Sequence, residues 1–440
     1  MDKDDCLAAK IRPSNLAIIG AGYVGLVTAA CFVELGQKVT CAESDHSKLA
    51  MLKRGECPIY EPGLGELISK GVSSGMLSFT DNAAEAATGA EFVFVCVQTP
   101  PKPDGSPDMS FVEEAARQVG PVLSPRTVVV NKSTMPVGST ERVRKICEDA
   151  GAAEVHFVSN PEFLREGTAV YDFMHPDRIV VGSSDTEAAV RVSELYKPLN
   201  APVLITDPAS AELIKYASNA YLAMRLSFVN ALAELADACG ADVKEVTLGM
   251  GYDTRIGFSF LKPGPGFGGS CFPKDTQALL SVARQMGVNF PLLEATLMIN
   301  EEQLQRVFRR IVDMAGGTEG KRIALLGLAF KANTDDVRYS PAIEIAKLLL
   351  NSGAEVVGTD PRAARNASKA LPDLAIASDA YSAAEGADCL AILTEWEEYR
   401  WLDYAAIAKT MKKPAIVDAR NILDPAALVR LGFTYKGVGR

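Results

Sequence analysis

Short apolar runs alternate with longer amphipathic stretches along the first half of the chain. The pattern predicts strands at residues 15–19, 38–42, 91–97, 127–131 and 155–159, with helices between them. Strands that alternate with helices are typical of a parallel, doubly wound sheet with helices on both faces. The first half of the chain is therefore predicted to be an α/β domain.

The pattern changes in the middle of the chain. A helical pattern begins at Ser210 and meets no glycine or proline before Gly240, which is too long for a helix that only crosses between two strands. Further helices are predicted to about Ala315. This stretch is expected to be a central helix that links two halves of the protein, extended by a helical middle domain.

A second α/β unit begins with a strand predicted at residues 322–326. It is a weak repeat of the first unit, because the segment from Gly353 to Asp360 resembles the segment from Gly36 to Glu43. The repeat lacks the complete glycine motif described next. The second unit is therefore expected to bind something other than a dinucleotide.

The glycine motif GAGYVG runs from Gly20 to Gly25, between the first predicted strand and the first predicted helix. In that context G-x-G-x-x-G predicts a site where a pyrophosphate approaches the backbone at Gly22 and meets the positive end of a helix. Glu43 ends the second strand, where a carboxylate can bind both ribose hydroxyls and repels a 2′-phosphate. The cofactor is therefore predicted to be NAD; the alternative is an α/β unit that carries the motif by chance.

The composition is that of a globular protein, with 48% hydrophobic and 23% charged residues. The net charge of −10, with no basic block, argues against non-specific binding to nucleic acid or to an anionic membrane. The nine cysteines are scattered without a Cys-x-x-Cys pair, and the three histidines (His46, His156, His175) are not at ligand spacing. We expect reduced thiols, a cytoplasmic location and no metal site.

One segment resembles an export signal. Lys10 and Arg12 precede an uncharged stretch at residues 13–33, which ends in the small residues Ala29-Ala30-Cys31. Because the glycine motif interrupts this stretch, we interpret it as a buried strand, a turn and a helix. Residues 1–14 are expected to be a flexible leader.

Residues 264–275 read GPGFGGSCFPKD, a glycine-rich segment followed by a cysteine and two charged residues. Four glycines in six residues predict a mobile loop that a ligand can approach closely. Ser270 is the predicted N-cap of a helix, so that the helix N-terminus and Lys274 favour the thiolate of Cys271. Asp275 would lie on the same helical face, and a nucleophile beside a carboxylate suits covalent catalysis followed by hydrolysis. The alternative, an inert buried thiol, is our interpretation of the other cysteines.

Two further segments carry candidate polar groups. Lys215 and Asn219 are four positions apart on the predicted central helix, and both can donate to an oxyanion; the alternative is a solvated helix face. The segment NPEFLREG, from Asn160, is predicted to be a short helix that places Glu162 and Glu166 on one face. One of these carboxylates can act as a general acid or base, or both only complement the helix dipole.

Taken together, these segments resemble the UDP-glucose/GDP-mannose dehydrogenase family, from about Leu16 to about Arg420. The motifs are, in order, GAGYVG, IYEPGL, QTPPKPDG, NKSTMPVGST, SNPEFLREGTA, the helix of Lys215 and Asn219, RIG with FLKPGPGFGGSCFPKD, and LAFKANTDDVRYSP. The lead-in FLKPG is similar to that of members that act on UDP-glucose. The resemblance implies two Rossmann-like domains with doubly wound parallel sheets, joined by the central helix and the helical middle domain.

The same resemblance implies oxidation of UDP-glucose to UDP-glucuronate by two successive hydride transfers to two NAD⁺. Cys271 matches the nucleophile, which would form a thiohemiacetal and then a thioester that water hydrolyses. Lys215 and Asn219 match the pair that stabilises the oxyanion. Asp275 matches the carboxylate that orders or activates water, and Glu162 matches a carboxylate assigned to acid–base work.

The resemblance also implies binding residues. The positions that match NAD contacts are Gly20, Gly22, Tyr23, Val24, Gly25, Glu43, Lys48, Thr99, Thr134 (also counted as catalytic), Glu166, Lys274 and Arg338. The positions that match substrate contacts are Glu162, Phe163, Leu164, Lys215, Asn219, Arg255, Phe260, Leu261, Lys262, Gly264, Gly268, Phe330, Lys331 and Arg420. Arg255 is expected to come from the partner subunit of a homodimer. Glu43 departs from the family, which has Asp there, and NAD is still expected to bind.

We therefore expect a leader at 1–14, an NAD-binding domain at 15–205, a central dimerisation domain with the cysteine loop at 206–315, and a UDP-sugar-binding domain at 316–440. Three alternatives stay open. The same oxidation can act on GDP-mannose or a UDP-N-acetylhexosamine. A two-electron hydroxyacid-type dehydrogenase would not need Cys271. A non-catalytic NAD-sensing or scaffold protein would leave the cysteine, lysine and carboxylates unexplained.

Overall fold

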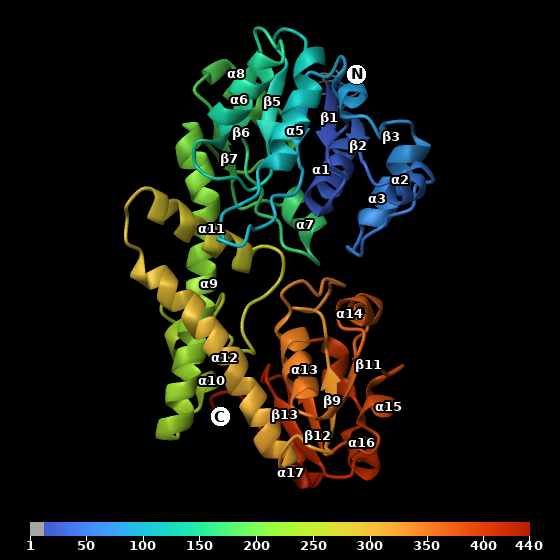
Figure 1. Cartoon of the computed structure of the whole chain (residues 1–440), viewed down its shortest axis with the longest axis vertical. Coiled ribbons are helices and arrows are strands. Elements are labelled where there is room, and N and C mark those ends of the chain that lie inside the picture. Colours follow the sequence, from blue (N-terminus) through green and yellow to red (C-terminus); the bar gives the residue numbers. More distant parts are fainter. Residues whose placement is uncertain (1–12) are drawn as a thin grey trace, which may run out of the picture. The chain divides into compact units, whose positions relative to one another are not determined.

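The computed structural model describes residues 13–440, so the expected leader lies almost entirely outside the described residues. The chain divides into two compact units, one that ends at Tyr216 and one that begins at Ala217. Each unit is built around one sheet (Figure 1).

The sheet of the first unit has eight strands in the order β3-β2-β1-β4-β5-β6-β7-β8. The strands are β1 (Asn15–Ile19), β2 (Lys38–Ala42), β3 (Leu77–Thr80), β4 (Phe92–Val95), β5 (Val128–Asn131), β6 (His156–Ser159), β7 (Ile179–Gly182) and β8 (Val203–Thr206). β1 to β6 are parallel, as predicted, but β7 pairs antiparallel with β6. The connection between β6 and β7 contains one short helix, the six-residue α7 (Ala169–Met174).

Helices cover both faces of this sheet. Leu16 and Ile18 of β1 pack on one face, and Ala17 and Ile19 pack on the other, as the alternation of side chains along a strand requires. The first face packs against α1 (Tyr23–Glu34), α3 (Leu64–Ser73), α7 and α8 (Thr186–Leu195). The second face packs against α4 (Ala83–Ala87), α5 (Ser110–Val119) and α6 (Ser139–Asp149). Leu49 and Leu52 of α2 (His46–Lys53) also belong to the core on the first face, and the remaining elements are η1 (Gly120–Val122) and η2 (Lys197–Leu199).

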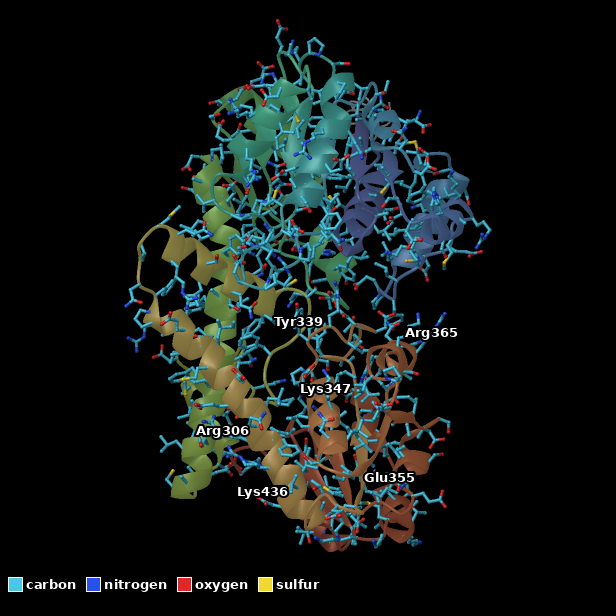
Figure 2. The ribbon with its side chains drawn as sticks, in the orientation of Figure 1. Arg306, Tyr339, Lys347, Glu355, Arg365 and Lys436 are labelled. Atoms are coloured by element: carbon cyan, nitrogen blue, oxygen red, sulfur yellow. The ribbon has the colours of Figure 1, made fainter. Side chains whose placement is uncertain are left out.

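The predicted central helix is α9 (Pro208–Cys239), which begins in the first unit and continues in the second. In the second unit it is followed by α10 (Val243–Gly251), α11 (Phe272–Gln285) and α12 (Pro291–Ala315), which ends where the helical stretch was predicted to end. Asp237 of α9 accepts from Arg310 of α12 at 2.6 Å and from Lys436 of the last strand at 3.2 Å. Lys436 is labelled in Figure 2.

The second sheet is parallel throughout, in the order β11-β10-β9-β12-β13-β14. Its strands are β9 (Arg322–Leu326), β10 (Glu355–Thr359), β11 (Ala375–Ile376), β12 (Cys389–Ile392), β13 (Ala415–Asp418) and β14 (Thr434–Lys436). The remaining helices are α13 (Pro341–Asn351), α14 (Ala364–Ala370), α15 (Ala380–Ala384), η3 (Glu397–Trp401), α16 (Tyr404–Thr410) and α17 (Pro425–Arg430). The order repeats that of the first six strands of the first sheet, so the predicted internal repeat is confirmed.

Residues 13–33 form β1, the glycine turn and most of α1, as we interpreted them. Among residues 13–440, none of the helices combines the length and the apolar character of a membrane span. Within the same residues, no disulfide joins any two of the eight cysteines.

Candidate active site

The three motif glycines lie in the turn from β1 to α1, and each has its own structural reason. A Cβ at Gly20, where φ is 101°, would lie 3.0 Å from the Cys96 carbonyl oxygen, and a Cβ at Gly25 would lie 1.9 Å from the Gly20 carbonyl oxygen. At Gly22 a Cβ would meet no atom within 4 Å. Packing therefore requires glycine at 20 and 25, whereas Gly22 leaves an open approach at the N-terminus of α1, as a pyrophosphate needs.

The predicted ribose carboxylate lies beside this turn. The Gly20 N–H donates to the carbonyl of Ala42, the last residue of β2, and Glu43 follows it half-buried. Glu43 Oε1 accepts from the Asp45 N–H at 2.8 Å. The Lys48 side chain is exposed in the first turn of α2.

A buried carboxylate that the sequence reasoning missed joins the glycine turn to a second loop. Glu61 accepts from the Tyr23 hydroxyl, from the Gly167 N–H at 2.6 Å and from the Ala169 N–H at 2.7 Å. Burial raises the pKa of Tyr23, and the hydrogen bond to Glu61 raises it further. The signal available in the sequence was the glutamate of the IYEPGL motif, to which no role was assigned.

The predicted helix at NPEFLREG is wrong. Residues 160–167 form an irregular loop, and α7 begins only at Ala169. The Asn160 side chain does not cap a helix, because its Oδ1 accepts from Lys132 and Tyr196 while its amide donates to the Val180 carbonyl. Glu162 closes a local turn by accepting from the Leu164 N–H at 2.6 Å. Glu162 and Glu166 therefore share no helix face.

Glu162 and Lys215 form a buried ion pair in the first unit. Lys215 Nζ lies 2.8 Å from Glu162 Oε1, and the two side chains are 4% and 6% exposed. Burial alone would raise the pKa of Glu162, but the Lys215 ammonium and the Leu164 N–H outweigh burial and hold that pKa below its ordinary value. The ring of Phe163 lies 5.5 Å from Lys215 Nζ and 3.6 Å from the Arg178 guanidinium.

Two predicted threonines meet at the carboxyl ends of neighbouring strands. Thr99 follows β4, Thr134 follows β5, and the Thr99 hydroxyl donates to the Thr134 carbonyl at 2.9 Å. Ligands of open α/β sheets bind at this edge of the sheet. The glycine turn, Glu43 and the loop of Glu162 also follow strands of the same sheet.

Cys271 lies at the N-terminus of α11 in the second unit. The helix begins at Phe272 with Cys271 as its N-cap, one residue later than predicted, and the Ser270 hydroxyl lies 3.6 Å from the Cys271 sulfur without capping the helix. Lys274 Nζ lies 2.5 Å from Asp275 Oδ1, so the ammonium predicted to favour the thiolate has a carboxylate partner. Asp275 is 1% exposed and accepts from the Asn219 amide at 2.6 Å. The structure thus brings together four predicted positions.

The glycine-rich loop before Cys271 is held in place, contrary to the predicted mobility. The Asn230 side chain accepts from the Gly264 N–H at 2.9 Å, and Gln303 donates to the Gly264 carbonyl at 2.7 Å. Asn300 pairs with both the N–H and the carbonyl of Phe267. These amides lie on α9 and α12, and their spacing in the sequence carried no signal of the contact.

The same loop packs against predicted substrate residues. A Cβ at Gly268 would lie 2.1 Å from the Tyr339 carbonyl oxygen, and one at Gly269 would lie 2.7 Å from the ring of Phe330. The Arg420 guanidinium donates to the Phe330 carbonyl at 3.0 Å and lies close to Gly264. Lys331 Nζ lies 5.7 Å from the ring of Phe330, and Arg338 accepts from the Gly269 N–H through its carbonyl while its side chain pairs with Asp336.

The remaining predicted substrate residues precede this loop. Arg255 is 87% exposed at its side chain and pairs with Asp253 at 2.6 Å. Arg255 and the buried Leu261 line a cavity of about 410 Å³. Lys262 is exposed, and Phe260 has a φ of 59°, a left-handed conformation that is strained for a non-glycine residue.

Asp360 is the counterpart of Glu43 in the second unit, but its carboxylate is buried and therefore cannot bind a ribose. Its carboxylate accepts from the backbone N–H groups of Leu328 and Ala329, just after β9, and from the indole of Trp396. It also accepts from the N–H groups of Arg362 and Ala363. The turn after β1 in the first unit is open to a ligand at Gly22. The corresponding turn after β9 in the second unit is occupied by the Asp360 carboxylate.

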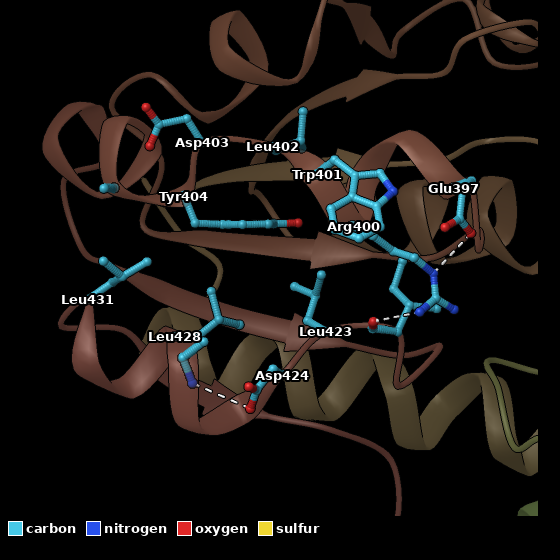
Figure 3. A pocket seen from close by; sticks show the side chains of 13 residues that line it. Glu397, Arg400, Trp401, Leu402, Asp403, Tyr404, Leu423, Asp424, Leu428 and Leu431 are labelled. Atoms are coloured by element: carbon cyan, nitrogen blue, oxygen red, sulfur yellow. Dashed lines mark hydrogen bonds and ion pairs between the residues drawn. The ribbon is translucent and has the colours of Figure 1, made fainter.

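A groove of about 490 Å³ lies elsewhere on the second unit (Figure 3). Trp401, Tyr404 and Leu428 are among the residues that line it, as are Arg400 and Glu397, which form an ion pair. None of the predicted site residues lines this groove.

Comparison with known protein families gives three consecutive matches that together cover most of the chain. Residues 14–200 match the NAD binding domain of the UDP-glucose/GDP-mannose dehydrogenase family, residues 209–302 match its central domain, and residues 324–425 match its UDP binding domain. The chain belongs to the UDP-glucose/GDP-mannose dehydrogenase family. The NAD binding domain of the family corresponds to the first sheet of this chain, and the UDP binding domain corresponds to the second sheet.

Three members illustrate the similarity. The UDP-glucose 6-dehydrogenase of Rhizobium meliloti (strain 1021) is 46% identical over 97% of this chain and 99% of its own length. The structure of a UDP-glucose dehydrogenase from Pyrobaculum islandicum has a TM-score of 0.92 at 39% identity and covers 98% of this chain and 99% of that one. The structure of a UDP-D-ManNAc dehydrogenase from Pyrococcus horikoshii has a TM-score of 0.86 at 28% identity, with 97% and 99% covered.

Proposed function

We propose that this chain oxidises the C6 hydroxyl of UDP-glucose to a carboxylate, giving UDP-glucuronate, with two NAD⁺ per sugar. The observation that carries the proposal is the position of Cys271, which caps α11 one turn before the buried Asp275–Asn219 pair. An enzyme that takes an alcohol past the aldehyde needs a nucleophile to add to that aldehyde, and a thiol at a helix N-terminus suits this step. The similarity to UDP-glucose dehydrogenases over nearly the whole chain favours glucose as the sugar.

The residues of the first unit fit NAD. The open side of Gly22 leaves room for a pyrophosphate at the N-terminus of α1, and the half-buried Glu43 offers a carboxylate to the ribose. We assign Gly20–Gly25, Glu43, Lys48, Thr99 and Thr134 to this binding. When bound, NAD⁺ supplies the acceptor for the hydride that leaves C6 in each oxidation.

The protein's own groups carry the remaining chemistry. The Cys271 sulfur adds to the C6 aldehyde as a thiohemiacetal, loss of hydride leaves a thioester, and water cleaves the C–S bond to give the carboxylate and regenerate the thiol. The Asn219 amide, oriented by Asp275, and the Lys215 ammonium donate to the oxyanion. Because the pKa of Glu162 is held low, Glu162 is a carboxylate at neutral pH and can accept a proton from water.

The proposal is tested by the NADH yield from limiting UDP-glucose, with the wild type and with Cys271→Ser. About two NADH per sugar from the wild type, with a variant that fails to complete turnover, supports both the substrate and the thioester. One NADH per sugar, or an unaffected variant, contradicts the mechanism and favours a two-electron dehydrogenase. No NADH from UDP-glucose, but turnover of GDP-mannose or a UDP-N-acetylhexosamine, assigns another nucleotide sugar.

A homodimer is part of the proposal. α9 exposes large apolar side chains in the second unit, with Tyr221, Phe228 and Leu235 more than half exposed, and Leu292 and Met298 of α12 are exposed as well. An apolar face of this kind marks a protein–protein contact. We assign it to a second copy of the chain, whose Arg255 would reach the substrate. Light scattering should give twice the chain mass of 46.9 kDa, and Phe228→Asp with Leu235→Asp should give the monomer; a monomeric wild type contradicts this assignment.

The proposal also assigns a function to each domain and a cellular location to the protein. We assign NAD binding to residues 15–205, dimerisation and the cysteine loop to residues 206–315, and the UDP-sugar to residues 316–440. Two observations support the last assignment: the Arg420–Phe330 contact beside the glycine loop and the Asp360 carboxylate that fills the turn after β9. Reduced thiols favour the cytoplasm, which fractionation of the native host would test.

A further inference from the structure

Lys132 carries a buried ammonium that, within the described residues 13–440, forms no ion pair with a carboxylate. The residue follows β5 directly and is 4% exposed. Its Nζ donates to Asn160 Oδ1 and to the Tyr196 hydroxyl, each at 3.1 Å, and among residues 13–440 no carboxylate forms an ion pair with it. A buried charge that has only neutral acceptors is costly to retain, so this position calls for a reason other than stability.

The two acceptors of Lys132 fix the start of the loop that carries Glu162. Asn160 Oδ1 accepts from Lys132 and from the Tyr196 hydroxyl, which lies 2.6 Å away, and its amide donates to the Val180 carbonyl at 2.8 Å. Both lone pairs of the Asn160 oxygen are therefore used. Glu162 follows two residues later and holds Lys215, so the loop, the carboxylate and the Lys215 ammonium form one connected set.

The titratable groups around Lys132 come from four elements. Cys96 faces it from the end of β4, Tyr196 from the end of α8, Glu162 from the loop after β6 and Lys215 from α9. Burial raises the pKa of Cys96 to about 12 and that of Tyr196 above its ordinary value, so both are neutral near pH 8. Burial lowers the pKa of Lys132 to about 8, against the opposing effect of Cys96 and Glu162. At neutral pH, one carboxylate thus lies among two ammonium groups.

We propose that Lys132 is a positioning residue for the Glu162–Lys215 pair. It anchors the loop of Glu162 through Asn160, and its ammonium is a second positive charge near the Glu162 carboxylate. The inference rests on the proposed function, in which Glu162 accepts a proton. Among residues 13–440, no hydrogen bond or ion pair joins Lys132 directly to either of these two side chains. Its effect is therefore expected on the turnover rate and on its pH dependence, and not on the binding of substrate or NAD.

The test compares Lys132→Met, Lys132→Arg and Lys197→Met, an exposed control beside Tyr196. Lys132→Met is expected to lower kcat about 100-fold, as misplacement of a reacting group does. The acid limb of its kcat–pH profile should move up by about one unit, because Glu162 loses a positive neighbour. Both KM values and the Kd for NAD, from calorimetry, should stay within about threefold. Lys132→Arg should bring the acid limb back, and Lys197→Met should match the wild type.

A Lys132→Met variant with wild-type kcat, or with an unmoved acid limb, overturns the inference. If that variant does not fold, Tyr196→Phe decides, because it keeps the charge and removes one acceptor: a kcat about tenfold lower is expected, and an unchanged kcat overturns the inference. Failure of the proposed function is distinguishable, since the wild type would then form no NADH from UDP-glucose.

Discussion

The Asn219 amide donates to Asp275 Oδ2 at 2.6 Å, and Asp275 accepts Lys274 on its other oxygen at 2.5 Å. The contact joins α9 to the first turn of α11. Both oxygens of a carboxylate that is 1% exposed are therefore occupied by donors. Asp275 thus sets the direction of the Asn219 amide and balances the Lys274 charge, one turn after Cys271.

Replacing Asp275 by Asn should slow the release of product from Cys271. The variant places two amides face to face and leaves the Lys274 ammonium without its counter-charge, so we expect a loss of about 1–3 kcal/mol in stability and a kcat lower by about 100-fold or more. Because hydrolysis is the impaired step, intact-mass spectrometry of the variant mixed with UDP-glucose and NAD⁺ should show the sugar nucleotide attached to the protein. Glu344→Gln, which breaks an exposed pair with Lys347, is the control.

A variant that releases product at the wild-type rate would contradict this role of Asp275. A variant that is slow but carries no adduct would place the defect before the thioester, in hydride transfer or in the addition of Cys271.

The sequence predicted the fold well because the fold depends on local patterns. Alternation in the strands, the glycine turn and the uninterrupted helix from Ser210 are properties of contiguous residues, and β1, Gly20 and α9 follow them. The prediction failed where distant side chains compete with local signals. NPEFLREG has the residues of a short helix, but the Asn160 side chain is used by Lys132 and Tyr196 and does not cap one.

The candidate site divides in the same way. Cys271, Asp275 and Asn219 are related by helix spacing, so the sequence could bring them together. Lys132 and Glu61 were missed because their partners are 28 and 106 residues away, and no local period connects them. The glycine loop was expected to move because glycine is permissive, whereas amides from α9 and α12 hold it.

The motif glycines provide a matched pair of variants. Gly22→Ala adds a methyl group that meets no atom within 4 Å, so the fold should keep its melting temperature while NAD binds about tenfold more weakly, since the methyl group occupies the pyrophosphate approach. Gly25→Ala places a Cβ 1.9 Å from the Gly20 carbonyl oxygen, so the backbone must move and the protein should melt at a clearly lower temperature. Thermal unfolding with and without NAD measures both effects. Equal melting temperatures for the two variants would contradict this difference between the glycines.

Variants of Asp360 and Glu43 test whether equivalent carboxylates have different roles in the two sheets, one in stability and one in binding NAD. In the wild type, backbone and indole N–H groups donate to the Asp360 carboxylate. Asp360→Asn replaces one of its oxygens with an NH₂ group that cannot accept these hydrogen bonds, so we expect the second unit to lose about 2–3 kcal/mol of stability. Glu43→Gln should leave stability unchanged and weaken NAD binding, since among residues 13–440 the Glu43 side chain accepts one hydrogen bond, from the nearby Asp45 N–H. Denaturant unfolding and NAD titration separate the two outcomes. An Asp360→Asn variant as stable as the wild type would contradict a structural role for this carboxylate.

Lys132 gives the stability of the protein a pH dependence of known sign. Burial lowers its pKa from an ordinary value of 10.5 to about 8 in the folded state. Below pH 8 the folded protein therefore holds a charged ammonium, at a cost of roughly 3 kcal/mol. Between about pH 8 and 10.5 the unfolded chain binds the proton and the folded chain does not, so this contribution makes the protein more stable as pH rises. Lys132→Met lacks the titration. The melting temperature of the wild type minus that of the variant should therefore increase from about pH 7 to about pH 9.5, whereas parallel curves would show that the folded protein leaves the pKa of Lys132 at its ordinary value.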